Sequence, residues 1–114
     1  MNVKFTPKTL DYLEELVTIL YQKGYFSWLD TSQKYVDELY ADIQTNLPTK
    51  QHKRAPNRYK IYGEDVHYAS FKKNRRTTWY AFFTKYQDEN NQIIYLVGYI
   101  GNNHTDAHHL YEGV

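Results

Sequence analysis

The sequence predicts a single α+β domain over residues 1–114, in which an N-terminal strand and a two-helix antiparallel hairpin precede an antiparallel β-meander, with the helices on one face of the sheet. Apolar residues recur at helical spacing in the first half of the chain. In the second half, short aromatic and β-branched runs alternate with polar turns, which is typical of strands. The length of 114 residues fits one domain of ordinary size.

The N-terminal part of the chain predicts a strand followed directly by a helix. Residues 2–5 alternate polar and apolar side chains, as a half-buried strand does. Thr6 is a suitable N-cap and Pro7 suits the first helical position. Gly24 is a suitable C-terminal stop, so we expect the first helix over residues 7–23.

A second helix follows a short aromatic turn. Asp30 with Gln33 three residues later predicts a capping box at its start. One apolar face continues to Leu47, and Pro48 predicts the end of the helix. Residues 48–58 are polar and cationic, which indicates an exposed loop.

The rest of the chain predicts four strands. Each is a run of aromatic and β-branched residues bounded by polar or glycine-containing turns. Both faces of the longest run carry bulky side chains, which indicates a central strand with some burial on each side. The four expected strands are residues 59–62, 66–71, 76–86 and 93–100.

The charge of the chain is distributed unevenly although its net value is +1. Residues 50–86 carry ten Lys or Arg against two acidic residues, a local balance of +8. Such a segment favours an anionic partner, and the alternative is a solvated basic face. Cysteine is absent, which excludes disulfides and thiolate chemistry. No apolar run approaches the ~20 residues of a membrane span, and no signal peptide is apparent, so we expect a cytoplasmic protein.

Two motifs resemble the RelE/ParE superfamily of bacterial type II toxin-antitoxin toxins. They are "RTTWYAFF" at residues 76–83 and "YLVGYIGNNHT" at residues 95–105. The resemblance extends over essentially the whole chain and implies a toxin that a cognate antitoxin protein neutralises. RelE-like members are endoribonucleases that cut mRNA on the ribosome, whereas ParE-like members bind DNA gyrase without catalysis. The fold does not separate these two classes. A basic RNA-binding module without toxicity is the third alternative.

Metal-free RNA cleavage needs groups that move protons and cations that stabilise the charge developing on the phosphate. His104 is the strongest acid/base candidate because imidazole transfers protons near neutral pH. Arg75 and Arg76 begin the aromatic strand, and Arg is suited to bidentate phosphate contact. Tyr111 resembles the terminal aromatic residue of some RelE-like toxins. The structural alternative for residues 102–104 is a turn that caps the strand through side-chain hydrogen bonds.

The remaining basic residues are candidates for contacts to the RNA backbone, which add affinity without sequence information. For Lys72, Lys73 and Arg75, which flank the turn before the expected strand at residues 76–86, the alternative is a charged hairpin tip that protects a strand edge. His104 and His108 could share a helical turn, but no further ligands complete a metal site, and no cofactor is expected. The candidate substrate-binding residues are Lys72, Lys73, Lys53, Arg54, Arg58 and Lys60.

Overall fold

The computed structural model describes residues 2–112, with the side chains of residues 2–110. The strands form one five-stranded sheet in the order β1-β5-β4-β3-β2. In chain order, the elements are β1 (Asn2–Phe5), α1 (Pro7–Gln22), α2 (Leu29–Asn46), the 3-10 helix η1 (Leu47–Thr49), β2 (Lys53–Arg54), the 3-10 helix η2 (Asn57–Tyr62), β3 (His67–Lys72), β4 (Thr78–Gln87), β5 (Ile93–Asn102) and α3 (Ala107–Glu112).

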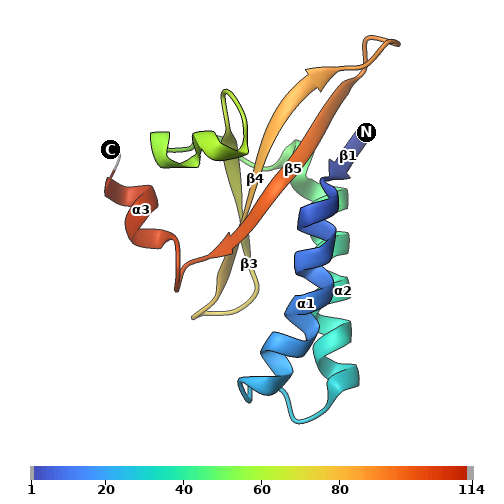
Figure 1. Cartoon of the computed structure of the whole chain (residues 1–114), viewed down its shortest axis with the longest axis vertical. Coiled ribbons are helices and arrows are strands. Elements are labelled where there is room, and N and C mark those ends of the chain that lie inside the picture. The colour runs from blue at the N-terminus through green and yellow to red at the C-terminus, as the bar shows by residue number, and fades with distance from the viewer. Residues whose placement is uncertain (1, 113–114) are drawn as a thin grey trace.

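The α+β class and the order of strand, helix hairpin and antiparallel strands are confirmed. Figure 1 shows α1 and α2 side by side along one side of the twisted sheet, with β5 and β4 at its centre. The N-terminal strand β1 is parallel to β5, and the other neighbouring pairs are antiparallel. No helix within residues 2–112 is long and apolar enough to cross a membrane.

The start of α1 follows the prediction and the start of α2 does not. Thr6 caps α1 by accepting a hydrogen bond from the Thr9 backbone N–H at 3.2 Å. The predicted capping box in α2 is wrong, because the helix begins at Leu29 without a side-chain cap. Asp30 therefore lies in the first helical turn, and Gln33 donates to Asp37 one turn further along at 2.8 Å.

The strand predicted for residues 59–62 is also wrong, because these residues belong to the 3-10 helix η2. The Tyr59 backbone N–H bonds to the Pro56 carbonyl at 3.0 Å, which tightens the chain into a turn. This turn places the Tyr59 ring flat on Phe82 of β4, with ring centroids 4.3 Å apart. The edge strand beside β3 instead forms at Lys53–Arg54, inside the predicted exposed loop.

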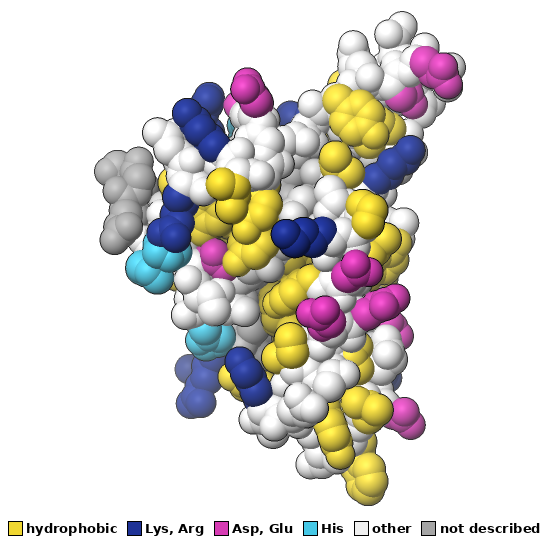
Figure 2. Space-filling view, in the orientation of Figure 1, with side chains coloured by type: hydrophobic (Ala, Val, Ile, Leu, Met, Phe, Trp, Pro, Cys, Tyr) yellow, Lys and Arg dark blue, Asp and Glu magenta, His cyan; other side chains and the backbone are white. Residues whose placement is uncertain are grey.

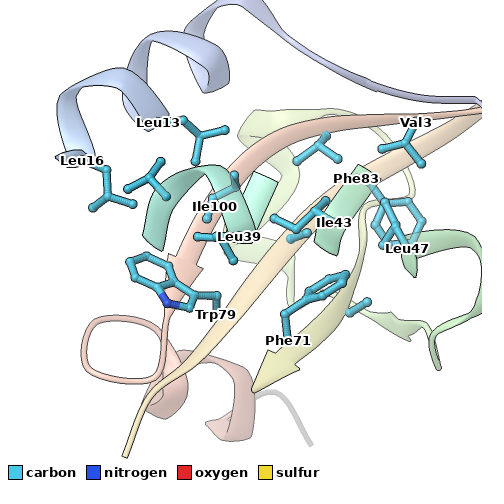
Figure 3. Close-up of a cluster of buried hydrophobic side chains, with 14 of the residues drawn as sticks. Val3, Leu13, Leu16, Leu39, Ile43, Leu47, Phe71, Trp79, Phe83 and Ile100 are labelled. Atoms are coloured by element: carbon cyan, nitrogen blue, oxygen red, sulfur yellow. The ribbon is translucent and has the colours of Figure 1, made fainter. Parts of the chain in front are cut away.

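The main core lies between the helix hairpin and one face of the sheet. Trp79, Phe83 and Phe71 point from β4 and β3 toward Leu39 and Ile43 of α2 (Figure 3). All five side chains are almost fully buried, so this apolar contact holds α1 and α2 on the sheet.

The opposite face of the sheet is covered as well, and the sequence did not predict which elements cover it. Side chains from η2 and α3 pack there on the aromatic residues of β3 and β4, at the left of Figure 1. The central strands therefore have buried side chains on both faces, as their bulky sequences indicated. The buried members of this second cluster are Tyr59, Val66, Tyr68, Tyr80, Phe82 and Leu110.

Candidate functional site

A cleft of about 500 Å³ lies between the helix hairpin and the end of the sheet where β5 finishes and β4 begins. One wall is apolar and comes from the helices, with Leu16, Ile19 and Leu20 of α1 among its residues. The facing wall is polar and comes from two loops, the β3–β4 turn and the segment after β5. His104 lies on this polar wall and its side chain is exposed.

Asn103 joins these two loops to each other. Its backbone N–H donates to the Thr78 carbonyl at 3.0 Å, and its Oδ1 accepts from the Thr78 N–H at 2.9 Å. Its Nδ2 donates to the Arg76 carbonyl at 2.9 Å. The residue before His104 is therefore bonded to the backbone of Arg76, so the loop carrying the arginines and the loop carrying the histidine meet.

Two further asparagines shape the loops. Asn74 Oδ1 accepts from the backbone N–H groups of Arg76 and Thr77, each at 2.9 Å. Asn102 Oδ1 accepts in the same way from His104 at 2.9 Å and from Thr105 at 3.2 Å. Such turns fix the backbone two and three residues beyond the asparagine. The expected capping role of the Asn-Asn-His segment is thus present, and it leaves the His104 side chain available on the cleft.

The buried carboxylate of Asp106 anchors the segment after β5. Its Oδ1 accepts from the Tyr59 hydroxyl at 2.8 Å, and its Oδ2 from the Thr105 hydroxyl at 2.7 Å. Tyr99 of β5 also donates to it, and the Asn102 backbone N–H donates to Oδ2 at 3.2 Å. These donors offset the cost of removing the carboxylate from water.

The same carboxylate keeps the neighbouring phenols protonated. Burial is the main cause that raises the pKa of Tyr59 and of Tyr99 well above the ordinary value, and the Asp106 carboxylate raises both further. Both hydroxyls remain donors across the physiological range as a result.

The predicted cations of the β3–β4 turn differ in what they can contact. Arg75 and Arg76 are exposed at the tip of the turn, and Lys72 is exposed at the end of β3. Lys73 is held by α2, with its ammonium 3.9 Å from Glu38 Oε2 and 5.0 Å from the centre of the Tyr35 ring. Figure 2 shows Lys or Arg side chains beside a His at this end of the sheet, at the lower left.

The other predicted cations lie elsewhere. Lys53 and Arg54 pair with Tyr68 and His67 at the start of β3, about 13 and 17 Å along that strand from Lys72 at a rise of ~3.3 Å per residue. Arg54 lies 3.6 Å from Asp65 Oδ1. The ten basic residues of the segment therefore do not form one surface.

Two more predicted residues, Arg58 and Lys60, lie in η2, over the second face of the sheet. Arg58 bonds to His109 of α3. Tyr111 is in α3, and its side chain lies outside the described residues.

The two histidines considered for a metal are not on one helical turn. His104 precedes α3, whereas His108 lies within it, its ring centre 3.7 Å from that of His109. Over the described chain, no group of three or more His, Cys, Asp or Glu could hold a metal ion.

Sequence reasoning missed the residues that the helix hairpin contributes to the cleft. Four of the residues that line it are at least forty residues before Arg75, the first predicted catalytic residue; they are Lys23, Tyr25, Phe26 and Tyr35. The aromatic content of the turn between the helices was the available signal. No family model, curated protein or solved structure matches this chain.

The Asp106 anchor predicts a difference between two glycines of β5. A Cβ added at Gly101 would stand 2.0 Å from Asp106 Oδ2, whereas at Gly98 the nearest neighbour would be 3.7 Å away. We expect Gly101→Ala to lower the free energy of unfolding by about 1–3 kcal/mol and Gly98→Ala to lower it by less. Urea unfolding of both variants measures this, and equal losses would contradict the role of the anchor.

The raised tyrosine pKa values predict alkaline destabilisation. The folded protein keeps the protons of Tyr59 and Tyr99 above pH 10.0, the ordinary tyrosine value, where the unfolded chain releases them. Their stabilising contribution is thus complete below that pH and decreases as the pH rises above it. The urea concentration at the midpoint of unfolding should fall with pH between about pH 8 and about pH 11. This fall should be less steep in the double variant Tyr59→Phe/Tyr99→Phe than in the wild type. The control is Tyr25→Phe, at an exposed position, which should follow the wild type.

Proposed function

We propose that this chain is a RelE/ParE-like toxin that cleaves RNA at the loop end of the sheet. The observation that carries the proposal is the hydrogen bonding of Asn103 to Arg76 and Thr78, which joins an exposed histidine to a loop with two exposed arginines. Imidazole can transfer protons near neutral pH, and guanidinium groups can bind phosphate.

In the proposed reaction the RNA 2′-oxygen attacks the adjacent phosphorus atom and the bond to the 5′-oxygen breaks. His104 takes the proton of the 2′-hydroxyl, and water supplies the proton to the leaving 5′-oxygen. Arg75 and Arg76 stabilise the negative charge that develops on the phosphoryl oxygens. The products are a 2′,3′-cyclic phosphate and a 5′-hydroxyl.

The resemblance extends the proposal to the cellular setting. The substrate is mRNA, cut on the ribosome or free, and the result is inhibition of translation. A cognate antitoxin protein is the proposed inhibitor, and the cytoplasm is the proposed compartment.

A gyrase-directed toxin is the second candidate, and one observation favours it. Tyr25, Trp28 and Leu29 at the tip of the helix hairpin have exposed fractions of 66%, 73% and 51%. Neighbouring exposed apolar side chains of this size are common at protein-protein contacts. This candidate requires no proton transfer by His104.

The double variant Arg76→Ala/His104→Ala tests the proposal in an inducible bacterial host. We expect the wild type to arrest growth and to produce discrete cuts in a translated reporter mRNA, mapped by primer extension. The double variant should lose about a hundredfold or more of the cleavage rate, because it lacks the proton-transfer group and one phosphate ligand. Circular dichroism of the purified variant checks that the fold is kept.

A matched control is Lys34→Ala/His108→Ala, which removes one cation and one histidine from exposed positions outside the cleft. It should cleave as the wild type does. Full cleavage by Arg76→Ala/His104→Ala would overturn the proposed site. Growth arrest without cuts, together with DNA damage signalling, would move the assignment to gyrase inhibition.

A further inference from the structure

The polar wall of the cleft offers hydrogen-bond donors in a fixed orientation. Each Oδ1 of Asn74 and Asn102 accepts two backbone N–H bonds, so both of its lone pairs are used. The Nδ2 atom of each side-chain amide, which carries two N–H donors, remains available to a ligand. Because the loop backbone fixes these bonds, neither amide can turn over to present its oxygen without breaking two of them.

The rest of the lining fits a flat, uncharged ring next to a negative charge. Phe26 and Tyr35 provide aromatic surface, and the buried Trp79 donates from its Nε1 to the Tyr35 hydroxyl at 2.9 Å. Among the described residues that line the cleft, none is Asp or Glu. Lys23 lines the cleft, and Arg75 and Arg76 lie in the loop that forms its rim. The volume of about 500 Å³ is ample for one nucleobase with its sugar.

We propose that this cleft binds one unstacked base of single-stranded RNA and selects uracil over cytosine. The inference rests on the proposed function and adds a specificity to it. Uracil presents O4 as an acceptor where cytosine presents an N4 amino group as a donor. The Nδ2 donors of Asn74 and Asn102 bond to the uracil oxygens, and the donor that faces position 4 meets the cytosine N4 amino group donor to donor.

Replacing one of these amides by a carboxylate reverses the hydrogen-bond character of the wall. Asp keeps an oxygen that accepts the loop N–H groups, so the turn is retained. In Asn102→Asp the second oxygen replaces Nδ2 and accepts hydrogen bonds. This variant should therefore favour cytosine, which a purely structural role of Asn102 would not cause.

The experiment compares 2′-O-methyl oligouridylate with 2′-O-methyl oligocytidylate of equal length, which bind but lack the attacking 2′-hydroxyl. Fluorescence anisotropy gives the two dissociation constants for the full-length protein. We expect the wild type to prefer oligouridylate by about tenfold, the effect of one well-placed base contact. Asn102→Asp should lose or reverse this preference, and Asn74→Asp should reduce it.

Asn57→Asp is the matched control because it adds the same negative charge at an exposed position of η2, outside the cleft. It should weaken the binding of both oligonucleotides and leave the ratio of their dissociation constants unchanged. Equal binding of the two oligonucleotides by the wild type, with RNA cleavage intact, would overturn the base preference and leave the proposed function standing. Absence of binding to either oligonucleotide, and of cleavage, would overturn both.

Discussion

The arrangement of the candidate site depends on the hydrogen bonds that the buried carboxylate of Asp106 accepts. It lies at the junction of β5, η2 and α3, and it accepts hydrogen bonds from Tyr59 and Tyr99 across the second face of the sheet. Hydrogen bonds to a charged group contribute about 1.5–3 kcal/mol each, so losing several of them would release the whole segment. The Asp106 backbone also takes part, because its N–H bonds to the Asn102 carbonyl at 2.8 Å and its carbonyl accepts the first bonds of α3.

Asp106 connects the elements on the two faces of the sheet. Asp106 holds η2 and α3 on the second face and also fixes the direction of the loop that carries His104 toward the first. An exposed loop would be a poor support for a catalytic group unless its own backbone bonds were fixed. Here Asn102 and Asn103 fix them, and the cations of the β3–β4 turn are held against the same segment.

Much of the architecture was predictable because it follows from local periodicity. The first helix has apolar residues at helical spacing, and Thr6 caps it as its sequence position indicates. The strands β4 and β5 are aromatic and β-branched runs bounded by polar turns. The capping box at Asp30 failed because α2 starts two residues earlier than this cap requires, with Trp28 at the N-cap position and Leu29 as the first helical residue. The strand at residues 59–62 failed because contacts distant in sequence decided the conformation. Tyr59 bonds to a residue 47 positions later, and no local pattern contains that information.

The candidate site was predictable only in part, for the same reason. His104, Arg75 and Arg76 were predicted because imidazole and guanidinium chemistry follows from the residue types themselves, and the structure brings the loops that carry them together. The other predicted cations were grouped by their closeness in sequence, but the length of β3 separates Lys53 and Arg54 from the β3–β4 turn. The apolar wall of the cleft comes from the helix hairpin, and only the folded sheet brings that hairpin to the loops.

The central claim is that RNA binds at the loop end of the sheet and not at the cations of β2 and η2. Backbone amide NMR of the ¹⁵N-labelled protein, titrated with a short 2′-O-methyl RNA, tests it most directly. The account predicts that the largest shift changes fall on residues 74–78 and 102–105 and on the cleft-lining part of α1. Changes confined to residues 53–60, with residues 102–105 unaffected, would contradict it.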